Sequence, residues 1–170
     1  VVATGPVHGV TQSLTILRWS PSLESGLDAE LIDTPGLDEV TGEARAVMAR
    51  SIAQKSDLIL FVVAGDITRT EYQALCELRS TQKPLILVFN KIDLYPDLDR
   101  QKIYRQLQKL NAANSGSLLE DIIAPHEIVT VAAKPQPIQV RTESTEGTVA
   151  NTWEYPEPEI DSLKNALVQI

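Results

Sequence analysis

A chain of 170 residues and 18.7 kDa is long enough to bury a core and predicts one globular domain. Apolar residues make up 43% and charged residues 22%, which excludes a disordered chain, and the apolar run from Leu58 to Ala64 is too short to span a bilayer. The net charge of -8 disfavours nucleic acid and anionic membrane surfaces as partners, and the lone Cys76 is typical of a reducing compartment such as the cytoplasm.

Apolar periodicity and turn residues divide the first half of the chain into alternating elements. These are strands at residues 12–19, 29–33 and 58–63 and helices at residues 43–55 and 70–80. The first two strands are separated by a turn and predict an antiparallel hairpin. The third strand, residues 58–63, is an uninterrupted apolar run, which is typical of a strand buried on both faces of a parallel sheet.

The second half of the chain continues this alternation. It contains strands at residues 85–89 and 128–132, a helix near residues 97–110, and a closing amphipathic helix marked by Ile160, Leu163, Leu167 and Ile170. Residues 135–158 are rich in proline, threonine and glutamate. They predict an irregular surface excursion before the closing helix.

Strands that alternate with helices predict an α/β fold, with a doubly wound and mostly parallel sheet and helices on both of its faces. In such a sheet the ligand crevice lies beyond the carboxyl ends of the strands. Asp33, Asn90 and Ala132 each fall at the carboxyl end of a predicted strand. The sequence therefore predicts that these positions, remote along the chain, converge at one edge of the sheet.

The first strand end carries Asp33-Thr34-Pro35-Gly36. The carboxylate of Asp33 suits Mg²⁺, usually through a water, because Mg²⁺ keeps several waters and takes few protein ligands. Gly36 lets the backbone approach a phosphate oxygen and offer its N–H without a side chain in the way. The segment alone would be an ordinary turn, but its position after a strand favours a phosphate and metal site.

The second strand end carries Asn90-Lys91-Ile92-Asp93. Asp93 can accept hydrogen bonds from N1–H and the exocyclic amino group of guanine, a pair of donors that adenine lacks on that edge. Adenine would leave a buried carboxylate without partners, at a cost on the order of 1–3 kcal/mol. Asn90 is expected to bridge neighbouring loops and reach the base, and the stem of Lys91 to lie over the ring. The segment therefore predicts a guanine site.

Together these elements resemble the translation-factor-related class of P-loop GTPases and, within it, the Era-like branch. A closer likeness is to bacterial, especially cyanobacterial, GTPases that carry a hydrophobic domain of unknown function after the GTPase domain. The similar stretches are residues 33–37, 56–66, 71–72, 88–95 and 132–137. The resemblance implies a single, partial GTPase domain over residues 1–170, in a protein that binds GTP or GDP with Mg²⁺ and hydrolyses GTP as a molecular switch.

The resemblance also assigns roles beyond the two strand ends. Thr11 matches the first-switch threonine, whose hydroxyl and carbonyl close over magnesium and the terminal phosphate. Thr11 and Gly36 are therefore the candidate catalytic residues, and Thr11 and Asp33 the candidate metal ligands.

A third nucleotide-binding segment is Ala132-Ala133-Lys134, after the strand that begins at residue 128. In the matching position of the family a backbone N–H, here that of Ala133, donates to the guanine carbonyl oxygen. Lys134 supports the base from the other side. Relatives usually have serine where Ala132 stands, so a hydroxyl that braces the loop is lost, with a modest expected effect.

Two departures from the family bear on activity. No stretch reads as GxxxxGK(S/T) and the chain opens at Val1, so we expect the first strand, the phosphate loop and the first helix to be missing. Without them, we expect this stretch alone to bind nucleotide poorly and to have little enzymatic activity. Leu37 follows Gly36, where Ras-like members place a water-orienting glutamine. Hydrolysis would then rely on backbone groups, a potassium ion or a partner. The resemblance thus implies slow turnover, accelerated by a partner or by dimerisation of GTPase domains.

A second function stays open at this stage, a degenerate GTPase-like binding module that no longer uses nucleotide. The absent phosphate loop supports that alternative, whereas the intact set of Asp33, Gly36, Asn90, Lys91 and Asp93 favours the GTP-hydrolysing switch. The resemblance implies a cytoplasmic protein brought to the membrane periphery by a domain outside this chain. The effector or activator is a protein that the sequence does not identify.

Overall fold

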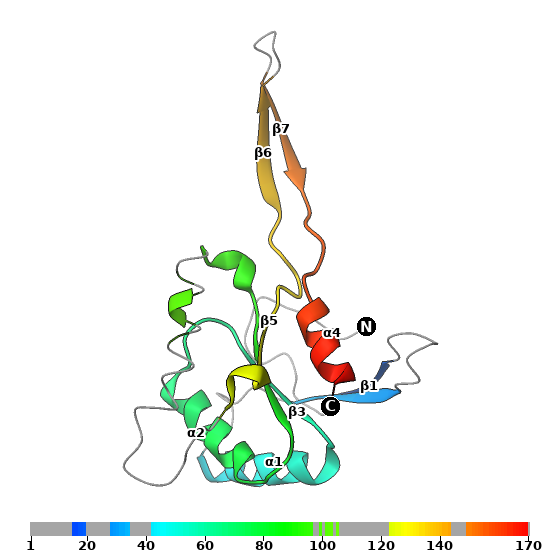
Figure 1. Ribbon diagram of the computed structural model, residues 1–170, viewed down its shortest axis with the longest axis vertical. Helices are drawn as coiled ribbons and strands as arrows, with labels where there is room; N and C mark the ends of the chain where they lie inside the picture. The colour runs from blue at the N-terminus through cyan, green and yellow to red at the C-terminus, as the bar shows by residue number, and fades with distance from the viewer. Residues whose placement is uncertain are drawn as a thin grey trace. The chain divides into compact units, whose positions relative to one another are not determined.

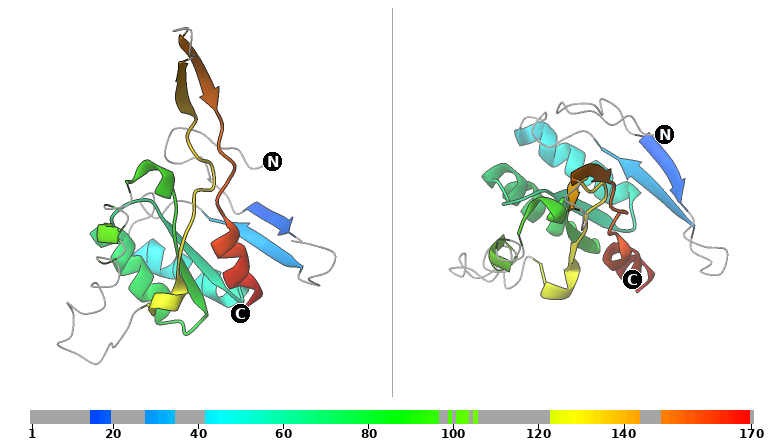
Figure 2. Two further views of the ribbon diagram at one scale, coloured as in Figure 1. Left: turned by 45° about the horizontal axis from the view of Figure 1, so that its top comes forward. Right: turned by 90° about the horizontal axis from the view of Figure 1, so that it is seen from above.

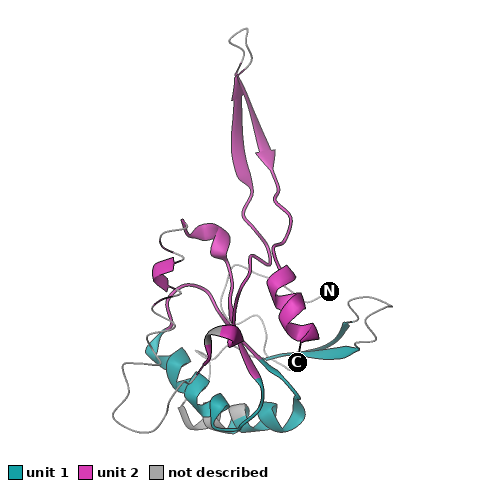
Figure 3. Cartoon of the chain, viewed as in Figure 1, with its two compact units in different colours: residues 1–59, 68–84 teal, residues 60–67, 85–170 magenta. Residues whose placement is uncertain are grey.

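The computed structural model describes most of the predicted elements and part of the chain between them (Figure 1). The described residues are 15–19, 28–34, 42–96, 99, 101–103, 105, 123–143 and 149–169. The chain divides into two compact units, one of residues 1–59 and 68–84 and the other of residues 60–67 and 85–170 (Figure 3). A single domain over residues 1–170 therefore stays a prediction.

The first unit contains the predicted antiparallel hairpin, which is confirmed, although residues 12–14 of its first predicted strand lie outside the described residues. Strand β1 (Thr15–Trp19) pairs with β2 (Ala29–Asp33), and the register places Thr15 opposite Asp33. Asp33 is the last residue of its strand and its side chain is half-buried. The hairpin therefore presents Asp33 at the carboxyl end of β2, as the sequence predicts.

Two helices that contact each other complete the described part of the first unit. They are α1 (Gly42–Lys55) and α2 (Arg69–Arg79), and both confirm the predicted helices. Thr68 and Glu71 cap α2 reciprocally: Glu71 N–H donates to Thr68 Oγ1 over 3.2 Å, and Thr68 N–H donates to Glu71 Oε2 over 2.8 Å. Such a cap stabilises a helix by about 1 kcal/mol, so the start of α2 is well defined.

A three-stranded sheet runs in the order β3 (Ile59–Val63), β4 (Leu85–Phe89) and β5 (Ile128–Thr130). β4 and β5 are parallel, with Leu87 opposite Ile128. All residues of β4 are buried, which is what a continuous apolar run in a central strand predicts. The predicted α/β fold with a parallel sheet is confirmed.

One residue of β3 departs from the predicted burial on both faces. Val62 is 57% exposed, whereas Phe61 and Val63 on either side of it are buried. Among the described residues β3 lies at one edge of its sheet. An outermost strand is less covered than a central one, so an apolar run alone overestimated its burial.

The closing helix is confirmed as α4 (Asp161–Val168), and it contacts β5. Ser162 Oγ donates to the carbonyl oxygen of Thr130 over 2.6 Å, which ties the first turn of α4 to the end of that strand. Just before the helix, Glu159 pairs with Ala132 in an isolated antiparallel bridge. Ile170 lies outside the described residues.

The predicted irregular excursion over residues 135–158 is wrong. The structure instead has an antiparallel hairpin of β6 (Ile138–Glu143) and β7 (Val149–Glu154), whose strands run side by side in the left view of Figure 2. The prolines that suggested irregular chain lie outside the strands, at positions 135, 137, 156 and 158. Within the strands, valine, isoleucine, threonine and tryptophan favour extended backbone.

The helix predicted near residues 97–110 is described only in part. Residues 99, 101–103 and 105 are helical. Of the apolar residues on one face of the predicted helix, Ile103 is described, whereas Leu107 and Leu110 lie outside the described residues. In the described parts of the chain, no helix is both long and apolar enough to cross a membrane.

Candidate functional site

The segment after β4 turns sharply at Asn90 and Lys91. Asn90 N–H donates to the carbonyl oxygen of Val63 over 2.8 Å, which extends the β3–β4 pairing by one residue. Lys91 has φ 61°, a left-handed conformation that is uncommon outside glycine. Its N–H donates to Asn90 Oδ1 over 2.8 Å, a local bond that supports this turn. The side chain of Lys91 is exposed and free to cover a ligand.

Asn90 joins two loops that are far apart in the sequence. Besides Lys91 N–H, its Oδ1 accepts the N–H of Ala133, with a nitrogen–oxygen distance of 3.1 Å. The bridge predicted for Asn90 is therefore present. Its side-chain NH₂ makes no hydrogen bond within the described part of the chain, so this group can donate to a ligand.

Asp93 lies in a short 3₁₀ helix, η2 (Ile92–Leu94), which is bonded to the residue that follows β5. Ile92 is buried and its N–H donates to the carbonyl oxygen of Val131 over 3.2 Å. Asp93 Oδ2 accepts the backbone N–H of Gln136 over 3.0 Å. These bonds fix the carboxylate between the loop after β4 and the loop after β5.

The other carboxylate oxygen of Asp93 is the most informative atom of the site. Asp93 Oδ1 is buried from solvent and has no hydrogen-bond partner among the described residues. Such an atom is costly, about 1–3 kcal/mol and more for a charged group, and native proteins satisfy nearly all of them. A donor from a bound ligand would satisfy Asp93 Oδ1.

The third segment is present, but its expected donor is already used. Ala133 N–H, predicted to bind the guanine carbonyl oxygen, is donated to Asn90 Oδ1. Ala132 N–H is donated to the carbonyl oxygen of Glu159 over 2.9 Å, so it is not available either. A base carbonyl beside Ala133 would share its N–H with Asn90. Lys134 is exposed, as a residue that covers a base should be.

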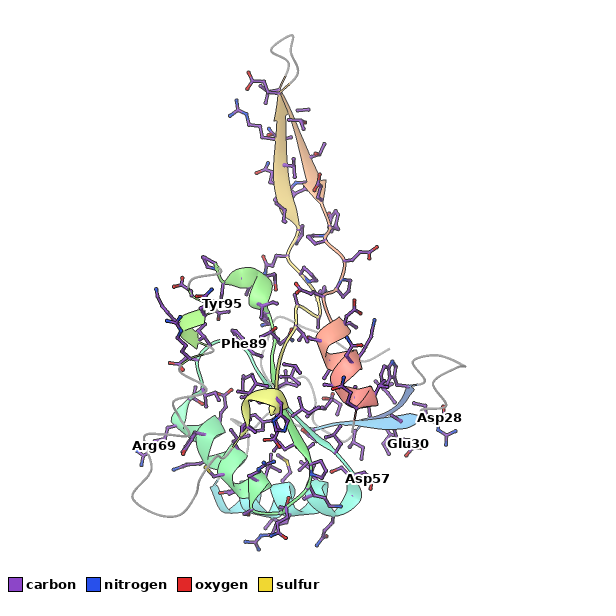
Figure 4. The ribbon with its side chains drawn as sticks, viewed as in Figure 1. Asp28, Glu30, Asp57, Arg69, Phe89 and Tyr95 are labelled. Atoms are coloured by element: carbon purple, nitrogen blue, oxygen red, sulfur yellow. The ribbon has the colours of Figure 1, made fainter. Side chains whose placement is uncertain are left out.

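The close approach of Gly65 to Tyr95, which we call the brace, was not predicted from the sequence. Gly65, after β3, has φ +93°, and a Cβ there would lie 2.6 Å from the hydroxyl oxygen of Tyr95. The Tyr95 ring packs against Phe89 with centroids 5.7 Å apart, near the end of β4 (Figure 4). Tyr95 thus links the loop after β3 to the loop that carries Asp93. Residues 56–66 and 88–95 contain both partners, but only the fold shows that they touch.

The phosphate end of the predicted site is described in part. Asp33 and Asp93 belong to different units, so their predicted convergence stays a prediction. Thr11 and Gly36 lie outside the described residues. Among the residues that are described, no group of three or more His, Cys, Asp or Glu side chains could hold a metal. The assignment of Mg²⁺ to Thr11 and Asp33 therefore also stays a prediction.

Residues 1–91 match the protein family described as "50S ribosome-binding GTPase". GTPase Der of Helicobacter hepaticus is 36% identical over 73 residues, which are 41% of this chain and 15% of that protein. The tRNA modification GTPase MnmE of Synechocystis sp. is 35% identical over 72 residues, 41% of this chain and 16% of that protein. MnmE of Thermoanaerobacter sp. is 32% identical over 83 residues, 46% of this chain and 18% of that protein.

These matches cover only part of the chain, so some of the predicted site residues lie inside the family match and others lie outside it. The chain spans less than a fifth of the length of these relatives. The family match covers more than half of the chain and ends at Lys91, so it includes Asp33 and Asn90 but not Asp93 or residues 132–136. Asp93 and residues 132–136 are therefore supported by the hydrogen bonds that join them to neighbouring segments.

Proposed function

Because the chain belongs to the GTPase family described as "50S ribosome-binding GTPase", we propose that its protein binds guanine nucleotide at Asn90–Asp93 and Ala132–Lys134 and hydrolyses GTP. The observation that carries this proposal is the buried, unpartnered Oδ1 of Asp93. Guanine offers N1–H and an exocyclic NH₂ on one edge, and these donors would satisfy that oxygen. Adenine offers no such pair and would leave the oxygen buried without a partner.

The remaining groups at the base site fit the same ligand. The free side-chain NH₂ of Asn90 can donate to a ring nitrogen, and the exposed stems of Lys91 and Lys134 can cover the two faces of a planar base. The position of Asn90 is fixed by three bonds, through its own N–H and its Oδ1. Such preorganisation lowers the entropy cost of binding.

At the phosphate end we propose that Asp33 holds Mg²⁺ through a water, that Thr11 closes over the metal, and that Gly36 N–H contacts the terminal phosphate. When bound, Mg²⁺ would neutralise charge that develops on the phosphates. The half-buried carboxylate of Asp33 at the end of β2 supports this role. Release of Thr11 and Gly36 after hydrolysis would make the protein a molecular switch.

The residue after Gly36 supports a slow reaction. Leu37 carries no group that can orient water. We therefore propose slow intrinsic turnover, with K⁺, a protein activator or a second GTPase domain supplying the missing group. Membership of the Era-like branch, a cytoplasmic location and attachment to the membrane periphery through a domain outside this chain are proposals that rest on the sequence resemblance.

The test uses the natural full-length protein and fluorescent GDP and ADP, with and without Mg²⁺. We expect GDP to bind at least about tenfold more tightly than ADP, and Asp93→Asn to remove this preference. The same variant should gain affinity for xanthine nucleotides, because xanthine has a carbonyl acceptor where guanine has the amino donor. Asp161→Asn, which changes an exposed carboxylate in α4, is the matched control and should retain the preference.

Two outcomes would count against the proposal. Equal affinity for both bases, or unchanged guanine preference in Asp93→Asn, would show that Asp93 does not read the base. No binding of any nucleotide to the full-length protein would favour the alternative, a GTPase-like module that no longer uses nucleotide.

A further inference from the structure

The hairpin of β6 and β7 is exposed over nearly its whole surface. All of its strand residues are exposed except Val140, which is half-buried. Large apolar side chains are among them: Ile138 is 55% exposed, Trp153 58%, and Tyr155, just after β7, 77%. Isolated two-stranded hairpins are marginally stable in water. A surface of this kind is typical of a site that a partner covers.

The hairpin also offers free backbone for pairing. Among the described residues β6 and β7 form a sheet of only two strands, so each strand has one edge that no other strand pairs. Such an edge presents a row of N–H and C=O groups that can receive a further strand. No proline lies within either strand to block that pairing.

The charge of this region indicates what the added strand would be. Residues 135–159 contain Arg141 and five acidic residues, Glu143, Glu146, Glu154, Glu157 and Glu159. This surplus opposes the phosphates of RNA and of anionic membranes. It also opposes a second copy of the same hairpin, because equal charges would meet. A basic protein segment is attracted instead.

We propose that the β6–β7 hairpin is a docking arm for an extended, basic segment of a partner protein, which pairs as a third strand and covers the apolar side chains. Backbone bonds supply affinity along the edge, and the glutamates select positive charge.

Docking on this arm is positioned to act on the base site. The arm begins two residues after Gln136, whose backbone N–H holds Asp93 Oδ2. At its other end, the chain returns to the same loop through the bridge between Glu159 and Ala132. A partner that shifts the arm would therefore strain two contacts of the base site, the hydrogen bond from Gln136 to Asp93 and the bridge between Ala132 and Glu159. This coupling, unlike the docking itself, rests on the proposed guanine recognition at Asp93.

The docking is tested on the full-length protein with a short synthetic peptide in which lysine alternates with threonine and valine. Hydrogen exchange is measured with and without the peptide. We expect amides within 138–143 or 149–154 to exchange at least about fivefold more slowly when the peptide is bound. A peptide with glutamate in place of lysine should give no protection.

Two charge-reversed double variants distinguish the effect of the hairpin's own charges on peptide binding from the effect of the chain's net charge. Glu143→Lys/Glu154→Lys should weaken binding of the lysine peptide on the order of tenfold and allow the glutamate peptide to bind. Asp57→Lys/Asp161→Lys makes the same change in net charge at exposed positions outside the hairpin and should leave the lysine peptide bound.

Four results would overturn the docking proposal. They are no protection of the hairpin by the lysine peptide, equal binding of the glutamate peptide, tighter binding of a single-stranded RNA oligomer, and a dimer whose formation protects the hairpin in the absence of peptide.

The coupling is tested by the release of fluorescent GDP from the full-length protein. The lysine peptide should change the release rate at least about fivefold in the wild type and not in Glu143→Lys/Glu154→Lys. An unchanged rate with GDP and peptide both bound would refute the coupling alone. Failure to bind any nucleotide, with hairpin protection intact, would refute the proposed function and the coupling that rests on it and leave the docking standing.

Discussion

The loops of the base site and the β6–β7 hairpin follow one another in the chain, yet they are held in opposite ways. The base-site loops rest on a fully buried β4 and on the buried Ile92, and hydrogen bonds from several segments fix Asn90 and Asp93. The hairpin is held by its own pairing, with almost no buried side chain. Buried strands thus position polar atoms for recognition. The hairpin instead leaves its side chains exposed, where a partner protein can contact them.

Removing apolar volume should affect the two regions very differently. Leu87→Ala empties space in β4, where the side chain is 2% exposed, and should lower the free energy of unfolding by about 3 kcal/mol. Ile138→Ala in the hairpin removes an exposed side chain and should cost roughly 0.5 kcal/mol or less. Urea unfolding of the two variants checks both values. Equal losses would show that the hairpin is packed after all.

The brace at Gly65 should be nearly as sensitive. Gly65→Ala places a Cβ against the Tyr95 hydroxyl at a positive φ and should cost about 2 kcal/mol. Adding Tyr95→Phe removes the clashing oxygen but not the backbone strain, so the double variant should recover part of that loss. Urea unfolding measures both. A fully stable Gly65→Ala would mean that the loop after β3 does not approach Tyr95.

Asn90 should matter for stability even without a ligand. Asn90→Ala leaves the N–H groups of Lys91 and Ala133 without their acceptor and should cost about 1.5 kcal/mol. Asn90→Asp keeps that acceptor and should be closer to the wild type. Thermal unfolding compares them, and equal destabilisation by both changes would argue against the bridge.

A smaller effect is expected where the hairpin joins the site. Gln136→Pro removes the N–H that holds Asp93 Oδ2 and should weaken GDP binding about fivefold in the full-length protein. Gln136→Ala keeps the N–H and should bind normally. If the two variants bind GDP equally well, the backbone of Gln136 does not position Asp93.

The parts of the site that the sequence predicted depend on side-chain identity. Only particular side chains can carry the roles of Asp33, Asn90 and Asp93, and each follows an apolar strand whose pattern is easy to recognise. The missed partners act through backbone or shape. Gln136 and Glu159 contribute main-chain groups that almost any residue could supply, and Gly65 is required because of its positive φ and because Tyr95 lies beside it.

The hairpin was missed for a different reason. Composition averaged over residues 135–158 mixed the flanking prolines with strand-forming residues, although no proline falls inside β6 or β7. The occupied donor of Ala133 could not be foreseen either, because it depends on where Asn90 Oδ1 lies in space.

A crystal structure of the full-length protein with GDP and Mg²⁺ tests the central claim most directly. We predict that Asp93 Oδ1 accepts a hydrogen bond from guanine N1–H or its amino group, and that the carboxylate of Asp33 lies on the phosphate side of the same nucleotide. A nucleotide bound away from Asp93, or carboxylates of Asp33 and Asp93 on opposite sides of the molecule, would contradict the account.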